Sequence, residues 1–137
     1  MGAADTTNPL SVGLSVPVLP KPCTLVIFGG AGDLSGRKLL PAIYNLGLDG
    51  VLPANFAVLG FSIEDMDDTG YRSFARQGVE RFSRQGVDQE HWPNYERPLF
   101  FQSGRFDDPA AYEALTQRLE EIEPQFGSPG NRVFYLA

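Results

Sequence analysis

The sequence predicts an α/β fold in which helices cover both faces of a doubly wound parallel sheet. Along residues 24–137, short apolar runs alternate with amphipathic stretches of helical period. This β-α-β-α-β-α-β order is typical of parallel strands joined by right-handed crossovers. In addition, a glycine-rich segment separates the first apolar run from the first helical stretch, where many doubly wound folds have a tight turn.

The first half of the predicted domain contains two strands and one interrupted helix. Residues 24–28 are apolar without alternation, as in a central strand covered on both faces. Residues 34–48 carry apolar side chains near helical spacing, and Pro41 predicts a kink or a restarted turn among them. The apolar run at residues 56–61 predicts the second buried strand.

An amphipathic helix is predicted next, because apolar residues between 71 and 82 recur at i, i+3, i+4, i+8 and i+11. Asp68 or Thr69 is expected to cap its amino end. Residues 84–98 are polar and irregular, and Trp92 is expected to anchor them locally.

The remaining elements are a strand at residues 99–103, a helix and a last strand at residues 132–137. Asp107 or Asp108 is expected to cap the helix, with Pro109 in its first turn. The apolar face predicted for this helix consists of Tyr112, Leu115, Leu119 and Ile122.

Two regions are predicted along the chain. Residues 1–23 are rich in Pro, Gly, Ser and Thr and are interpreted as a flexible leader, and residues 24–137 as one domain. A buried strand at the end of the sequence would leave part of its sheet uncovered. We therefore expect the domain to be incomplete at its carboxyl end and the chain to be a piece of a larger protein.

Composition excludes several kinds of partner. The net charge is −6 and Lys and Arg form no run, which argues against nucleic acid and against an anionic membrane surface. No apolar stretch reaches the roughly 20 residues that span a bilayer. Cys23 is the only cysteine, so that no internal disulfide can form, and the cytoplasm is the expected compartment.

The glycine-rich turn is the strongest candidate binding site. A dinucleotide pyrophosphate must approach the backbone closely, which small residues permit, and the following helix supplies oriented N–H groups. Gly29 would allow the tight turn, Gly32 would let amides reach the phosphate, and Ser35 is small enough for close helix packing. A glycine-rich turn without a ligand is the alternative interpretation. The cofactor-binding residues predicted in this Rossmann-like turn are Gly29, Gly30, Ala31, Gly32, Asp33, Leu34, Ser35 and Gly36.

Four segments of the sequence together match one known family. They are GGAGDL at residues 29–34, RKLLPA at 37–42, GRFDD at 104–108 and NRVFYLA at 131–137. In this order they resemble the amino-terminal, nucleotide-binding part of glucose-6-phosphate dehydrogenases. The resemblance covers residues 24–137, and a generic Rossmann domain would not carry these segments together.

The resemblance implies an activity for the parent protein. That protein would oxidise glucose 6-phosphate at C1 to 6-phosphogluconolactone, in the pentose phosphate pathway, with hydride transfer to NADP or NAD. The family's catalytic histidine lies in a part of the family chain that this sequence does not contain. His91, the only histidine here, does not match that motif and is predicted to be a surface residue. No catalytic residue is assigned, and the chain alone is expected to be inactive.

Two further residues complete the predicted cofactor site. In the family, the lysine of the basic pair lies near the active site, which implies such a place for Lys38. From the residues alone, a cation near a phosphate and a solvated helix charge are equally good interpretations. Ser62, after the second strand, could hydrogen-bond the ribose of either cofactor. The family also implies a homo-oligomer that forms through another domain.

The residues after Ser62 bear on the choice between NADP and NAD. Many family members have an arginine there, close to the adenosine 2′-phosphate, but this sequence has Ile63, followed by Glu64 and Asp65. Isoleucine cannot pair with a phosphate, whereas an acid in this region can accept a hydrogen bond from the ribose 2′-hydroxyl. We hypothesise that NAD is tolerated or preferred, unless another arginine such as Arg72 reaches the site.

Other interpretations of the sequence remain open. A non-catalytic nucleotide-binding module and another kind of Rossmann enzyme are the alternatives, although the Tyr-xxx-Lys pair of short-chain reductases is absent. The acidic residues 64–68 are interpreted as a solvated turn rather than a metal site. Glu120, Glu121 and Glu123 are similarly expected to form a solvated helix face.

Overall fold

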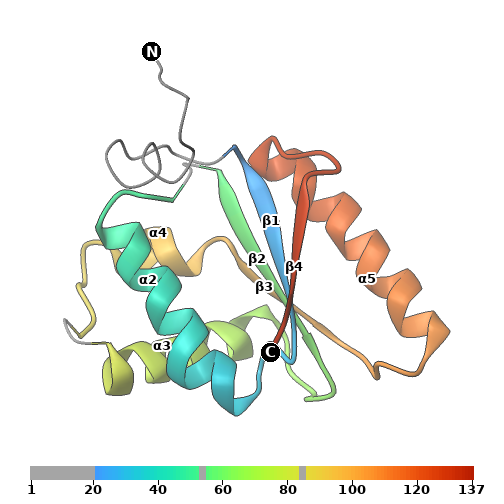
Figure 1. Cartoon of the computed structure of the whole chain (residues 1–137), viewed down its shortest axis with the longest axis horizontal. Coiled ribbons are helices and arrows are strands. Elements are labelled where there is room, and N and C mark those ends of the chain that lie inside the picture. Colours follow the sequence, from blue (N-terminus) through green and yellow to red (C-terminus); the bar gives the residue numbers. More distant parts are fainter. Residues whose placement is uncertain (1–20, 53–54, 84–85) are drawn as a thin grey trace, which may run out of the picture.

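The described residues form one sheet of four parallel strands in the order β3-β2-β1-β4 (Figure 1). The computed structural model describes residues 21–52, 55–83 and 86–137. The predicted fold class is confirmed, and each strand begins and ends within one residue of its predicted bounds. The strands are β1 (Cys23–Phe28), β2 (Phe56–Ser62), β3 (Leu99–Ser103) and β4 (Arg132–Leu136).

Helices cover both faces of the sheet. In Figure 1, α2, α3 and α4 lie on one side and α5 on the other. Most of the leader predicted at residues 1–23 lies outside the described residues, but Cys23 is buried and already belongs to β1. The helical elements are η1 (Ser35–Leu39), α2 (Leu40–Leu48), α3 (Asp68–Phe82), α4 (Trp92–Glu96), α5 (Pro109–Ile122) and η2 (Glu123–Phe126).

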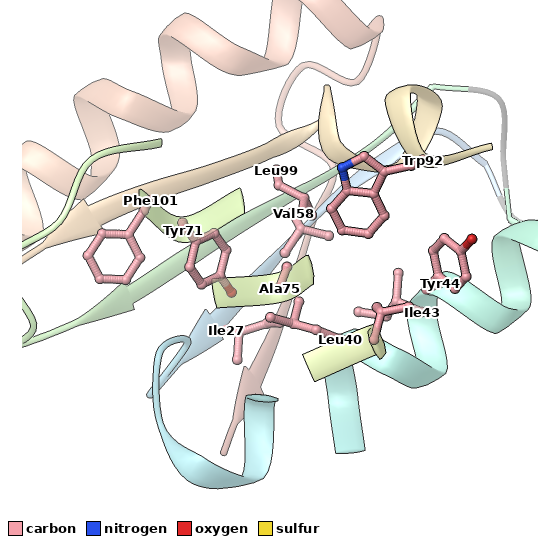
Figure 2. Close-up of a cluster of buried hydrophobic side chains, with 11 residues drawn as sticks. Ile27, Leu40, Ile43, Tyr44, Val58, Tyr71, Ala75, Trp92, Leu99 and Phe101 are labelled. Carbon is pink, nitrogen blue, oxygen red and sulfur yellow. The ribbon is translucent and has the colours of Figure 1, made fainter. Parts of the chain in front are cut away.

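The strands contribute side chains to two hydrophobic cores, because successive side chains of a strand point to opposite faces of the sheet. In β1, Ile27 joins the core under α2 and α3, while Val26 joins the core under α5. Figure 2 shows the first core, in which Tyr44, Tyr71 and Trp92 surround the strand side chains. Burial on both faces explains why these strands appear in the sequence as unbroken apolar runs.

The first helix is irregular, as the sequence predicts, but the irregularity precedes Pro41. Residues Ser35–Leu39 form a π-helical turn, in which the Leu40 amide donates to the Ser35 carbonyl. Proline has no N–H to bond the carbonyl four residues earlier, and its ring crowds that carbonyl, which belongs to Arg37. A wider turn at this point accommodates the proline without ending the helix.

The amino end of α3 differs from the prediction by one residue. Its N-cap is Asp67, whose carboxylate accepts a hydrogen bond from the Gly70 amide at 2.8 Å. Asp68, a predicted cap, is instead the first helical residue. Its carboxylate accepts from the Phe101 amide at 2.8 Å and pairs with Arg118, so that it joins α3 to β3 and α5.

Three other predictions about helices need correction. The segment predicted to be irregular contains the short helix α4, whose first residue, Trp92, is buried in the core as the expected anchor. Glu123 does not belong to a solvated face, because it is 4% exposed and pairs with Arg132 at 2.5 Å. In α5, Ala111 is buried in place of Tyr112, which is 40% exposed; the cap is Asp108, one of the two predicted residues.

Among the described residues, no helix combines the length and the apolar character needed to cross a membrane.

Candidate functional site

The candidate site lies at the carboxyl ends of the strands, at the point where the strand order reverses. The chain continues from β1 to β2 on one side of the sheet, and later returns to the other side of β1 as β4. Open α/β sheets have a ligand-binding crevice at such a switch point. A Cβ atom at Gly29 would lie 3.3 Å from the carbonyl oxygen of Ala137, so the turn after β1 lies beside the end of β4.

Gly29 starts the turn in a conformation that favours glycine. Its φ is +83°, in the left-handed region. Its amide donates to the Phe61 carbonyl at 2.8 Å, and its carbonyl accepts from the Gly32 amide at 2.9 Å. The buried hydroxyl of Ser35 also donates to the Gly29 carbonyl, at 2.9 Å. The turn is therefore held in place before any ligand binds.

Gly30 allows the turn to pack closely against β2. A Cβ atom at Gly30 would lie 2.5 Å from the Cα atom of Gly60, which is too close for any side chain. The Tyr71 ring covers the other side of Gly60, and its hydroxyl donates to the Gly30 carbonyl at 3.0 Å. Burial raises the pKa of Tyr71, which keeps this hydroxyl protonated as a donor. Gly30 is thus a packing position rather than a free surface for phosphate.

The first helical residues after the turn present unpartnered amides. Among the described residues, the N–H groups of Asp33, Leu34 and Ser35 have no hydrogen-bond acceptor, whereas the Gly36 amide bonds the Gly32 carbonyl at 3.1 Å. Such amides, together with the helix dipole, attract anions. The Asp33 carboxylate is 77% exposed and is turned to Arg37, with a shortest separation of 2.8 Å. It therefore extends along the helix surface and is neutralised there.

A groove of about 500 Å³ runs from the turn along the carboxyl ends of the first three strands. Its walls include the exposed apolar side chains of Ile63 and Phe106, which are 63% and 52% exposed. The residues lining the groove are Gly29 and Gly32 after β1, Ser62, Ile63 and Glu64 at and after the end of β2, and Gly104, Arg105, Phe106 and Asp107 after β3.

The predicted residue Ser62 lies in this groove, and its hydroxyl already makes a hydrogen bond to the glycine-rich turn. Its hydroxyl oxygen accepts from the Ala31 amide at 3.2 Å, and its side chain is almost fully buried. Its hydroxyl hydrogen has no acceptor among the described residues, so it can still donate to a ligand. The structure therefore brings Ser62 together with Gly29 and Gly32, as the sequence predicts.

Lys38 is not among the residues that line this groove. It is exposed on the π turn and lines a separate depression with Arg37, Pro41, Ala42, Asn45 and Phe82. The structure therefore does not bring it together with the groove that contains Gly29, Gly32 and Ser62.

Sequence reasoning missed Arg105 and Phe106 as groove residues. Arg105 donates from Nε to Asp107 Oδ1 at 3.1 Å and from Nη2 to Asp107 Oδ2 at 3.3 Å. This hydrogen bonding lowers the pKa of the Asp107 carboxyl and raises that of the guanidinium. The family segment GRFDD carries both residues, but only the strand order shows that it faces the turn.

Two residues weighed in the sequence lie away from the groove. Arg72 donates to the carbonyls of Glu96, Arg97 and Leu99, at the start of β3 and so at the opposite end of the sheet. It cannot be the arginine that replaces Ile63. His91 is exposed, as predicted, and lines a cavity of about 230 Å³ beside α2 and the start of β3.

The doubly wound sheet and the glycine-rich turn at its switch point define a dinucleotide-binding domain. Residues 26–137 match the family described as the NAD binding domain of glucose-6-phosphate dehydrogenase. The chain belongs to this family.

Named relatives agree with this assignment. Over 125 residues the chain is 38% identical to a glucose-6-phosphate 1-dehydrogenase of Chlamydia pneumoniae, an alignment that covers 91% of this chain and 24% of the relative. Over 118 residues it is 39% identical to the corresponding protein of Mycolicibacterium smegmatis, which covers 85% and 23%. The chain thus spans about a quarter of the length of the curated relatives that it matches.

Solved structures support the fold. A glucose-6-phosphate dehydrogenase in complex with its substrate glucose-6-phosphate superimposes with a TM-score of 0.75 at 24% identity, over 87% of this chain and 25% of that chain. A glucose-6-phosphate 1-dehydrogenase from Mycobacterium avium gives a TM-score of 0.70 at 21% identity, over 85% and 23%.

Proposed function

We propose that this chain binds a nicotinamide dinucleotide, with the pyrophosphate over the turn at residues 29–36. The observation that carries the proposal is the unpartnered amides of the exposed residues Asp33 and Leu34, next to a turn fixed by Gly29 and Gly30. Backbone donors held in place before binding suit a diphosphate, because they are already oriented and are concentrated at the positive end of a helix. The exposed walls formed by Ile63 and Phe106 suit the flat adenine ring.

The protein that contains this domain is proposed to oxidise glucose 6-phosphate. Support comes from the family and from the relatives' names, since each of them is a glucose-6-phosphate 1-dehydrogenase. The nicotinamide, when bound, would accept the hydride from C1 of the sugar, and a base outside the described residues would take the hydroxyl proton. In this chain the turn would orient the cofactor. Lys38, exposed on the adjacent helix, would offer its cation to a phosphate group.

Both NAD and NADP are proposed as cofactors. Ile63 follows the second strand and is exposed, but it has no group that could pair with a 2′-phosphate. Glu64 lines the same groove and can accept a hydrogen bond from the ribose 2′-hydroxyl of NAD. Ser62 can donate to the ribose of either cofactor.

The compartment and the oligomeric state of the enzyme are proposed from composition and family. The single cysteine and the acidic balance are consistent with the cytoplasm. Assembly into a homo-oligomer through residues outside this domain is proposed from the family alone.

A charge placed on the turn tests the binding proposal. Gly32→Asp would put a carboxylate beside the helix-start amides and repel a pyrophosphate, and so we expect binding of both NAD and NADP to weaken by tenfold or more, on the order of the loss of one charge-assisted contact. Isothermal titration calorimetry measures both affinities. Gly47→Asp is the matched control, because a Cβ atom there would meet only Leu52, at 3.7 Å. Equal affinities in the two variants would contradict the proposed site.

A further inference from the structure

Arg105 extends from the loop after β3 into the cofactor groove. Ser103 pairs in register with Ser62, and the Gly104 amide donates to the Ser62 carbonyl at 2.9 Å. The Ser103 hydroxyl also donates to the Glu64 carbonyl, at 2.8 Å. These bonds place the segment that carries Arg105 directly beside the segment that carries Ile63. In this way the structure supplies an arginine next to the position where the sequence lacks one.

The guanidinium of Arg105 is only partly used by the protein. Asp107 occupies the Nε and Nη2 donors on one edge, and among the described residues the Nη1 group has no acceptor. The side chain is 64% exposed and is the only basic one among the residues lining the groove. A guanidinium with one edge oriented by a carboxylate and the other edge free is well suited to a phosphate dianion.

Glu64 provides the opposite charge in the same groove. Its carboxylate has no hydrogen bond or ion pair among the described residues, and only its backbone carbonyl is engaged. Asp107 also lines the groove, but its charge is paired with Arg105. The groove therefore contains one cation suited to a phosphate and one free carboxylate suited to a hydroxyl donor.

We propose that Arg105 is the residue that selects for NADP, because its free guanidinium edge binds the adenosine 2′-phosphate. This inference rests on the proposed binding of a nicotinamide dinucleotide. Glu64 acts in the opposite direction, since it repels the 2′-phosphate and can accept a hydrogen bond from the 2′-hydroxyl of NAD. The ratio of the two affinities is then set by these two residues rather than by Ile63.

Two substitutions with opposite predicted effects on the ratio of NADP to NAD affinity test the proposal in the full-length enzyme. Arg105→Ala should weaken NADP binding about tenfold, the lower end for a charge-assisted hydrogen bond at an exposed site, and leave NAD within about twofold. Glu64→Gln should raise the ratio of NADP to NAD affinity by about two- to fivefold, because only a surface charge is removed. Calorimetric titration with NADP and NAD gives both affinities, and kcat/KM for each cofactor provides a second reading of the ratio.

Control variants separate an effect on cofactor selection from a general effect of substitution on the structure. Arg81→Ala removes an exposed arginine whose guanidinium lies over the Phe82 ring, and should leave the ratio unchanged. Arg105→Lys keeps the charge without the planar fork and should retain part of the NADP affinity. If Arg105→Ala weakens both cofactors equally, or neither, the inference is wrong while the binding proposal stands. If the unaltered protein binds neither cofactor, both are wrong.

Discussion

At the scale of single residues, the glycines of the turn have different structural roles. The sequence treats them as one motif, but the structure separates them by what each would contact. Gly29 is needed for its positive φ, and Gly30 for its packing against Gly60. Gly32 has more space, because a Cβ atom there would lie 3.2 Å from the Gly29 carbonyl oxygen. Gly29 and Gly32 line the groove, whereas Gly30 does not.

Gly30→Ala is therefore expected to destabilise the protein. The added methyl group would lie 2.5 Å from the Cα atom of Gly60, a backbone contact that cannot give way as a side chain can. Overpacking of this kind costs about 1–3 kcal/mol. Gly47→Ala provides the contrast, because its methyl group would make an ordinary contact and remove a helical glycine, which stabilises by about 0.5–1 kcal/mol. Urea unfolding of the two variants measures both changes in the free energy of unfolding, and equal stabilities would contradict the packing role of Gly30.

Arg105 shows what a single sequence does not reveal at this scale. Its neighbours in the chain are Gly104 and Phe106, and nothing in them indicates a cofactor contact. Its relevance follows from the register between β2 and β3, which brings it beside Ile63. The turn itself could be predicted, because its function depends on residues that are consecutive in the sequence.

At the scale of elements, the strands were predictable and the ends of helices less so. An apolar run buried on both faces has a clear signature, and β3 begins and ends at its predicted residues. The cap of α3 was misplaced because adjacent aspartates can both serve. Contacts with β3 and α5 decide between them by engaging Asp68, which leaves Asp67 as the cap. The helix α4 was missed because its five residues are too few to show a helical period.

Glu123 illustrates a charged residue whose burial the sequence could not show. It follows two exposed glutamates, but the chain turns there into η2, and its carboxylate meets Arg132 of β4 at 2.5 Å. It also accepts from the Gly130 amide at 3.2 Å. The hydrogen bond from Arg132 lowers the pKa of Glu123 below its usual value of 4.5.

Glu123→Gln should therefore destabilise the protein in a pH-dependent way. Because the pKa of Glu123 is lowered in the folded state, its ionised form stabilises the fold fully above about pH 4.5, and this stabilisation is lost as the pH falls through the folded-state pKa. At neutral pH the variant should lose about 1–3 kcal/mol, as expected when a largely buried pair loses its charge. Unfolding curves at a series of pH values measure the difference in the free energy of unfolding between the two proteins. A difference that stayed constant from neutral to acid pH would rule out the ion pair as its cause.

At the scale of the whole molecule, the two ends of the sheet carry different chemistry. The carboxyl ends carry the glycine-rich turn, the unpartnered amides and the groove, and the opposite end carries Arg72 with its backbone acceptors. The only histidine of the chain, His91, lies at the amino end of α4 and is not among the groove residues. The described residues therefore combine the proposed cofactor site with no histidine that could serve it as a base.

The 137-residue chain by itself is thus expected to bind nucleotide without turning over glucose 6-phosphate. NADP at about 100 times its Kd should stabilise the folded chain by about 2.7 kcal/mol, and the midpoint of thermal unfolding should rise accordingly by several degrees. If Gly32→Asp weakens binding tenfold or more, the stabilisation at the same NADP concentration should fall to about 1.4 kcal/mol or less. His91→Ala should leave it unchanged. Dilute samples are needed, because Phe134 and Leu136 of β4 are 56% and 80% exposed and such apolar surface promotes association. Formation of reduced nicotinamide with glucose 6-phosphate would contradict this expectation. His91→Ala would then be the first variant to assay for loss of that activity.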